Sequence, residues 1–384
     1  MSQDNRIHFL DALRGYALMG LFLIHMIEYF ELYWRQPAAT PELINTVLFG
    51  IFGGKAYAIF AFLFGISFFI ILNNQTKRGV DFRLRFLWRL TILFVLGYLH
   101  ALIYGGEVLQ ILALCGLLLI PLWFAPNWLV LVASLFFLLQ MPAWGLIAWL
   151  NQSDIDISKP FFSMYQPHVY DVYATGSLWE LLAVNSWQGN ATKWLFMWES
   201  GRLWTICGLS LLGFLLARLA FFSDFKRHQS RFNWGLVIFA VLFALLHFGQ
   251  DFIAAIPHAE KTARLFFGIF GAYENLTITL FSVCAFLVLY HLGADKILRY
   301  LAPPGRMTLS IYISQSIIGV FIFYGCGLNG WTYLGQMNSF LLGVFLWVLQ
   351  IVFAIWWFKY FRFGPLEWLW RAATYTSFNI PFKK

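Results

Sequence analysis

Apolar runs of about twenty residues, separated by short polar stretches, form the dominant pattern along the chain. A helix needs about 20 mostly apolar residues to cross the hydrocarbon core of a bilayer. Runs such as 90–99 and 340–357 are continuously apolar, whereas the strands of a membrane β-barrel alternate over about ten residues. The pattern therefore predicts an all-α, polytopic membrane helix bundle. We expect ten spans, at residues 9–31, 47–72, 86–104, 108–125, 127–150, 202–222, 233–252, 265–291, 307–326 and 338–361.

The predicted spans fall into two groups of five, joined by one long connection. We expect an N-terminal half at 1–150, an extracytoplasmic loop at 151–201, and a C-terminal half with an amphipathic tail at 202–384. The loop carries tryptophans among polar residues, which suits segments that lie at the membrane interface. A catalytic lid is the alternative interpretation of this loop.

Composition agrees with membrane embedding. Apolar residues make up 60% of the chain and charged residues only 11%, which excludes a water-soluble globular protein and a disordered chain. The net charge of +8 would suggest nucleic acid as the partner of a soluble protein, but here it reports topology. Nineteen of the 26 Lys and Arg residues fall on one side of the ten-span arrangement, together with both ends of the chain. We therefore expect both termini in the cytoplasm, membrane lipids as partners, and no nucleic acid.

The four cysteines lie far apart inside apolar runs, without the spacing of a metal site or a disulfide framework. We therefore predict no metal site and no tightly bound cofactor.

Four ionisable residues interrupt the first predicted span. At 100° per residue, Asp11, Arg14, His25 and Glu28 occupy one arc about 100° wide, as expected of a stripe that faces the bundle interior. Such groups are costly inside a membrane, so each needs a partner or a task. An imidazole one turn from a carboxylate is suited to general-base chemistry, which makes His25 and Glu28 catalytic candidates. Asp11 and Arg14 are either a structural ion pair or part of an anion site.

Further polar groups lie at a similar depth to His25 on other predicted spans. Lys55 lies about 12 Å into the second span, and His100 and Glu107 flank the turn between the third and fourth spans. The sequence alone does not establish that these side chains converge. If they do, His100 is a second candidate base, Glu107 its orienting carboxylate, and Lys55 a group that stabilises a developing oxyanion.

Several motifs resemble the YeiB-like bacterial membrane family, known as domain of unknown function 418. They are LDALRG at 10–15, GK at 54–55, FLFG at 62–65, GYLH at 97–100, GEVL at 106–109, GRMTL at 305–309 and FGPLEWLWR at 363–371. The likeness covers nearly the whole chain, and it implies a multi-pass protein of the bacterial cytoplasmic (inner) membrane.

The opening motif is also similar to the broader superfamily of multi-pass membrane acyltransferases. These include the acyltransferase-3 O-acetylases, the glucan succinylase type and the lysosomal heparan N-acetyltransferase type. An Arg followed eleven residues later by His is a hallmark of the acyltransferase-3 group, and Arg14 and His25 match it. YeiB-like relatives commonly carry Asn where His25 stands and Asp where Glu107 stands, which favours His100 as the alternative base.

This resemblance implies transfer of an acyl group from a cytoplasmic donor of the acyl-CoA type to an extracytoplasmic or lipid-linked acceptor, such as a glycan or a lipid. Arg14 and Arg306, with Asp11, would hold the phosphates of the donor. The alternative function is a small-molecule or lipid transporter or flippase without acyl transfer, in which the same polar stripe lines the path of the substrate. A structural or assembly subunit is the third interpretation.

Overall fold

A computed structural model describes residues 3–28, 30, 32–37, 41–155, 159–222 and 225–384. Every regular element longer than an isolated bridge within these residues is helical. The helices of the first half are α1 (Gln3–Ile27), α2 (Leu43–Ile51), α3 (Ala56–Thr76), α4 (Arg83–Ala101), α5 (Leu109–Leu122), α6 (Asn127–Leu138) and α7 (Met141–Gln152).

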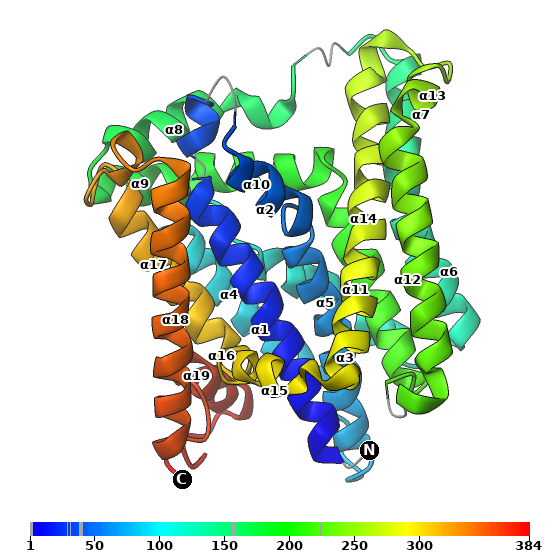
Figure 1. The fold of residues 1–384 in the computed structure, drawn as a ribbon, viewed down its shortest axis with the longest axis vertical. Helices are drawn as coiled ribbons and strands as arrows, with labels where there is room; N and C mark the ends of the chain where they lie inside the picture. The colour runs from blue at the N-terminus through cyan, green and yellow to red at the C-terminus, as the bar shows by residue number, and fades with distance from the viewer. Residues whose placement is uncertain (1–2, 29, 31, 38–40, 156–158, 223–224) are drawn as a thin grey trace.

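The region predicted as an interfacial loop is also helical. It contains a 3₁₀ turn at Phe161–Met164, α8 (Gln166–Thr175), α9 (Leu178–Val184), a π-helical turn at Asn185–Gly189, and α10 (Asn190–Glu199). These helices lie across the end of the bundle that is far from the two chain termini (Figure 1). They also supply part of the candidate site, which the interpretation of this region as an interfacial loop did not foresee.

The C-terminal part of the chain contains one more set of long helices and several short ones. They are α11 (Arg202–Arg218), α12 (Phe225–Phe248), α13 (Gln250–Ala254), α14 (Ala263–Leu289), α15 (Asp295–Leu298), α16 (Ala302–Arg306), α17 (Thr308–Phe323), α18 (Gln336–Tyr360) and α19 (Pro365–Tyr375). The short helix α19 packs against α4 and α17 near the chain termini. The predicted amphipathic tail is thus a helix attached to the bundle.

The polytopic helical fold is confirmed, with fewer full-length spans than the ten expected. Within the described residues, six helical segments are long and apolar enough to cross a membrane, and eight are if each of two bent helix pairs counts as one span. The bends are 49° between α6 and α7 and 68° between the segments 178–199 and 202–218. The predicted spans 108–125 and 307–326 correspond to α5 and α17, of 14 and 16 residues. At 1.5 Å per residue they reach about 21 and 24 Å, which is short of the 30 Å hydrocarbon core.

Both ends of the described chain lie at the same end of the bundle (Figure 1). This arrangement agrees with an even number of crossings, while the side of the membrane on which the termini lie stays a prediction. The expected division into two halves and a loop also stays a prediction. Across that division, α11 of the second half packs closely against α3 and α6 of the first half.

Two glycines explain the close packing of α3 and α11. A Cβ atom on Gly65 would overlap the carbonyl oxygen of Ser210, and a Cβ atom on Gly213 would overlap the carbonyl oxygen of Phe62. Each helix therefore presents a glycine to the backbone of the other. Small residues at such contacts let helices in a bilayer approach closely, since apolar burial between helices gains little against lipid.

We expect Gly213→Ala to destabilise the protein by about 1–3 kcal/mol, because the added methyl group would force α3 and α11 apart. Thermal unfolding of the purified protein in detergent measures the effect. Gly268→Ala is the matched control, because a Cβ atom at Gly268 on α14 has no other atom within 4 Å. Equal melting temperatures for the two variants would contradict this account of the contact.

Candidate functional site

Two cavities meet in the middle of the bundle. One, called here the histidine cavity, has a volume of about 570 Å³ and is lined by residues of α1, α2, α3, α8, α10, α11 and α17 and of the connection before α5. The other, called the arginine cavity, has a volume of about 370 Å³ and is lined by residues of α1, α3, α4, α5, α16, α17 and α19. Both volumes fall in the range of ligand pockets.

His25 on α1 lines the histidine cavity, and two neighbours hold its ring. The hydroxyl of Tyr104 lies 2.9 Å from His25 Nδ1, and the carboxylate of Glu28 lies 3.7 Å from the same nitrogen. Glu28 also accepts a hydrogen bond of 3.2 Å from the indole of Trp34. The imidazole and the carboxylate therefore lie next to each other, at a separation longer than a hydrogen bond.

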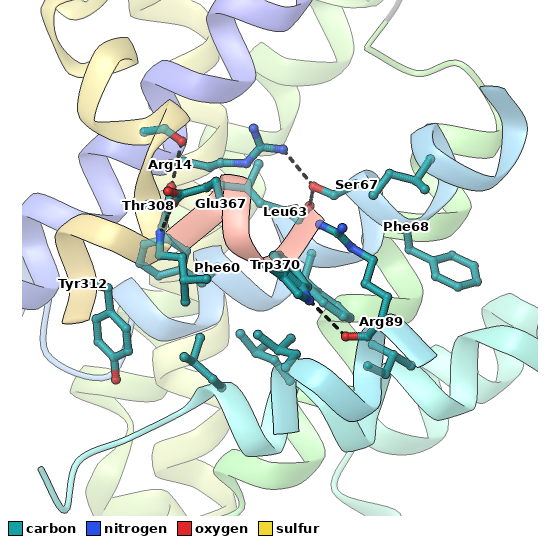
Figure 2. A pocket seen from close by; sticks show the side chains of 18 of the residues that line it. Arg14, Phe60, Leu63, Ser67, Phe68, Arg89, Thr308, Tyr312, Glu367 and Trp370 are labelled. Atoms are coloured by element: carbon teal, nitrogen blue, oxygen red, sulfur yellow. Dashed lines mark hydrogen bonds between the residues drawn. The ribbon is translucent and has the colours of Figure 1, made fainter. Parts of the chain in front are cut away.

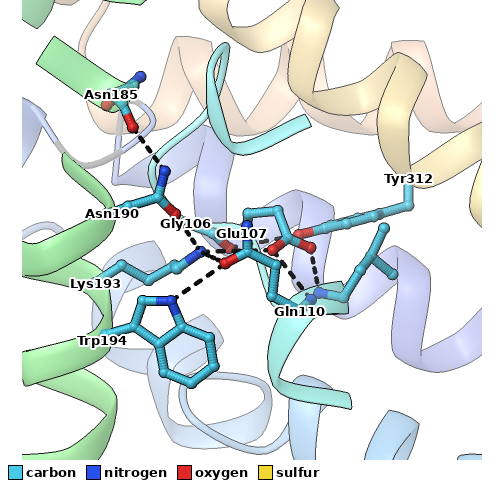
Figure 3. A network of polar contacts seen from close by, with 9 residues as sticks. Gly106, Glu107, Gln110, Asn185, Asn190, Lys193, Trp194 and Tyr312 are labelled. Carbon is cyan, nitrogen blue, oxygen red and sulfur yellow. Dashed lines mark hydrogen bonds and ion pairs between the residues drawn. The ribbon is translucent and has the colours of Figure 1, made fainter. Parts of the chain in front are cut away.

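Glu107 also lines the histidine cavity, within a buried polar network (Figure 3). Its carboxylate accepts hydrogen bonds from the amides of Leu109 and Gln110 at the start of α5, and it lies 3.6 Å from Lys193 Nζ. Lys193 in turn donates to Gln110 Oε1 at 2.8 Å and to Asn190 Oδ1 at 2.9 Å. Burial raises the pKa of the Glu107 carboxyl to about 7, against the opposing effects of Lys193 and the two amides. The network joins α10 to the connection between α4 and α5.

The arginine cavity is lined by four arginines, Arg14, Arg89, Arg306 and Arg371. Figure 2 shows Arg14 and Arg89 among its lining residues. Arg14 pairs with Asp11 and donates to Ser67 Oγ at 2.8 Å. The other three stack on aromatic rings, with guanidinium-to-centroid distances of 3.5 Å for Arg89 on Trp370, 4.1 Å for Arg306 on Phe358 and 4.5 Å for Arg371 on Phe363. A guanidinium stacked on an aromatic ring keeps its N–H donors in the plane of the guanidinium itself, where they can bind an oxyanion.

Glu367 on α19 is the carboxylate of the arginine cavity, and it caps the first turn of α17. It accepts hydrogen bonds from the amides of Leu309 at 2.6 Å and Ser310 at 3.1 Å, and from the Ser310 hydroxyl at 2.5 Å. Burial raises the pKa of this carboxyl. These bonds fix α19 against α17, and so hold Trp370 and Arg371 in the cavity wall.

The two cavities share three lining residues, Leu21, Val108 and Tyr312. Arg14 and His25 lie on opposite sides of this shared wall, eleven residues and about 16 Å apart along α1. The hydroxyl of Tyr312 donates to the carbonyl of Gly106 at 3.4 Å, next to Glu107. The two cavities therefore adjoin at these three side chains, which we call the partition.

The predicted site residues fall into three groups. His25, Glu28 and Glu107 line the histidine cavity, and Arg14 and Arg306 line the arginine cavity. Three do not line either cavity, namely Asp11, Lys55 and His100. The expectation of one common site for His25, Lys55, His100 and Glu107 therefore holds only for His25 and Glu107.

Neighbouring groups explain why Asp11, Lys55 and His100 do not line a cavity. Asp11 is buried against Arg14. Lys55 precedes the first residue of α3 and donates to the carbonyl of Phe49 at 3.0 Å. His100 is 3% exposed and packs edge-on against Tyr312 at 5.0 Å between ring centroids. Among the described residues, neither ring nitrogen of His100 has a hydrogen-bond partner, and Glu107 does not orient it.

Sequence reasoning missed Tyr104, Lys193 and Arg202 as members of the histidine cavity or its surroundings. Tyr104 was visible only as part of a turn, and Lys193 lies in the region interpreted as an interfacial loop. One feature of the sequence could have pointed to Lys193 and Arg202: both are basic residues that do not lie on the predicted cytoplasmic side. Among the described residues, no group of three or more His, Cys, Asp or Glu side chains has metal-site geometry.

Comparison with known proteins gives relatives but no activity. Residues 216–377 match the family described as "Protein of unknown function (DUF418)". The chain is 24% identical over 99% of its length to an "Uncharacterized 39.9 kDa protein in amylase 3'region" of Bacillus acidopullulyticus, covering 97% of that protein. It is 26% identical to the "Uncharacterized protein YxaH" of Bacillus subtilis strain 168, with 99% and 97% of the two chains covered. It is 25% identical to the "Uncharacterized protein YeiB" of Escherichia coli strain K12, with 95% of each chain covered.

Proposed function

We propose that this multi-pass membrane protein, which matches DUF418 over residues 216–377 and is similar to the uncharacterized proteins YxaH and YeiB, transfers an acyl group across the membrane. The donor is of the acyl-CoA type, and the acceptor is a hydroxyl or amine on an extracytoplasmic or lipid-linked molecule. The two cavities that meet at Leu21, Val108 and Tyr312 are the observation that carries the proposal.

The arginine cavity suits the donor. Arg89, Arg306 and Arg371 stack on aromatic rings, which leaves guanidinium donors for phosphate groups. The lining of the same cavity also includes apolar side chains, with Phe60, Leu63 and other residues of α3 and α5. A cavity with both guanidinium groups and apolar side chains suits a donor that carries phosphates and an acyl thioester.

The histidine cavity suits the reaction. With His25 as the general base, the imidazole takes the proton of the acceptor hydroxyl or amine as the acceptor oxygen or nitrogen attacks the thioester carbonyl. The new C–O or C–N bond forms, the C–S bond breaks, and the proton leaves with the thiolate as free thiol. Glu28 stabilises the imidazolium while it carries the proton, and Tyr104 keeps the ring in position. Lys55 is directed to a backbone carbonyl, so it has no part in this scheme.

The orientation follows from the same proposal. Helices α16 and α19, which line the arginine cavity, lie toward the end of the bundle that carries the chain termini (Figure 1). The basic connections of the sequence predict that this end is cytoplasmic. The donor would then enter from the cytoplasm of a bacterial cell, and the acceptor would bind on the far side of the inner membrane. A transporter or flippase stays the alternative, because two cavities separated by a partition also fit alternating access.

The test is an acyl-transfer assay on the full chain reconstituted in liposomes. With labelled acyl-CoA donors and a broad panel of glycan and lipid acceptors, we expect release of free CoA thiol in proportion to labelled product. Arg306→Gln should raise the KM for the donor about tenfold with little change in kcat, because one charged hydrogen bond to phosphate is lost. Arg299→Gln is the control, because Arg299 lines neither cavity. Substrate uptake without thiol release would identify the transporter instead.

A further inference from the structure

Arg202 is a cation that lines the histidine cavity and has no carboxylate partner among the residues that the structure describes. It is the first residue of α11, directly after Gly201, whose φ of 71° turns the chain sharply out of α10. Its guanidinium contacts two aromatic rings, 5.3 Å from the centroid of Tyr57 and 4.7 Å from that of Phe196. Within the described parts of the chain, it forms neither an ion pair nor a hydrogen bond.

The other charges of this cavity are already occupied. Lys193 lies against Glu107, and Glu28 accepts from Trp34 and faces His25. Arg202, His25 and Tyr57 line the same cavity, so the guanidinium and the candidate base face one space. A cation enclosed by protein is costly unless an anion pairs with it. Cation–π contacts with the two rings use none of the N–H donors of the guanidinium, which stay available to an oxyanion.

A second polar group of the same wall lacks a partner. Thr192 on α10 lines the cavity, and its Oγ1 atom is buried without a hydrogen-bond partner among the described residues. The first turn of α11 has no side-chain cap, so the positive end of its dipole adds to the field of Arg202. Unpaired donors around a cavity of about 570 Å³ indicate a ligand larger than a single ion.

The geometry points to a phosphate-bearing ligand in the histidine cavity, held by the guanidinium of Arg202 with the hydroxyl of Thr192 as a second contact. In the proposed reaction this ligand is the acceptor, so its phosphate would anchor it while a neighbouring hydroxyl or amine faces His25. That role depends on the proposed acyl transfer, whereas the binding itself does not. Two sources share this chemistry, a free phosphate ester and the headgroup of an anionic lipid.

Binding of glycerol phosphate and of phosphatidylglycerol to the detergent-purified chain tests the inference without any acyl donor. Thermal unfolding is followed with glycerol phosphate against glycerol, and in micelles containing phosphatidylglycerol against uncharged diacylglycerol. All measurements use an Arg306→Gln/Arg371→Gln background, since the arginine cavity would also bind phosphate. We expect one of the two phosphate ligands to raise the melting temperature, and Arg202→Gln to weaken its binding about 10- to 100-fold.

Two controls separate binding from folding. Arg35→Gln removes a guanidinium that pairs with Asp171 at 2.8 Å and lines neither cavity, so it should leave the ligand effect unchanged. If Arg202→Gln does not fold, Arg202→Lys is measured in its place. This variant keeps the charge and loses the planar guanidinium edge, so it should bind the ligand about tenfold more weakly than the parent protein. A response to glycerol phosphate identifies a soluble phosphate ester as the ligand, and a response to the lipid alone identifies a lipid headgroup. No response to either ligand, or an equal response in Arg202→Gln, would overturn the inference.

Discussion

Replacing His25 with alanine is expected to lower acyl transfer about 100- to 10,000-fold while the protein still folds. The magnitude is that of losing a general base. His25 lines the cavity in which the acceptor would bind, and its ring contacts Tyr104 and Glu28. The helix α1 does not depend on this side chain, because the surrounding residues Met26 and Ile27 are buried in the apolar core. The measurement is the kcat for thiol release from acyl-CoA in reconstituted liposomes.

His100→Ala is the control for this result, because His100 is the other candidate base. His100 lines neither cavity, so its removal should change kcat by less than about tenfold and act mainly on stability. Glu28→Gln should fall between the two, since it removes the charge that faces His25 but leaves the imidazole in place. If His100→Ala abolished turnover and His25→Ala did not, the assignment of the base would be reversed.

The helical fold could be predicted from the sequence because the apolar runs are long and the spacing of charges is regular. Spans such as 338–361 and 265–291 agree closely with α18 and α14. The number of spans could not be predicted as well. Helices α5 and α17 are apolar but too short to cross a bilayer unaided, and α6 and α7 are joined at a sharp bend. Gln140, at the bend, has a φ of 56°, a conformation that helical periodicity does not reveal.

The candidate site was predicted where its residues share one helix. The stripe on α1 depends only on helical geometry, so the separation of Arg14 from His25 and the contact of His25 with Glu28 both follow from spacing. Residues from different helices could not be matched in this way. His100 and Glu107 are seven residues apart, but the chain turns between them and directs Glu107 to Lys193. The position of Lys193 depends on how α10 packs across the bundle end, which is a tertiary property.

Removing the carboxylate of Glu107 is expected to destabilise the protein by about 3–5 kcal/mol, the cost typical of breaking a buried ion pair by removing one partner. In Glu107→Ala, Lys193 would keep its bonds to Gln110 and Asn190 but would lose the opposite charge. The amides of Leu109 and Gln110 would also lose their acceptor at the start of α5. The measurement is thermal and denaturant unfolding of the purified protein in detergent.

A double-mutant cycle distinguishes loss of the charge pair from loss of packing. Glu107→Gln keeps the volume and one acceptor oxygen for the amides, and Lys193→Met keeps the length of the side chain without its charge. Each single variant should be destabilised, whereas the double variant should recover most of the stability, because neither charge is then buried alone. Additive losses would mean that Glu107 acts as a helix cap and that Lys193 is held by Gln110 and Asn190 independently. In that case the hydrogen bond of Lys193 to Gln110, and not an ion pair, would join α10 to α5. Lys193 would then be a second cation available to a ligand in the histidine cavity.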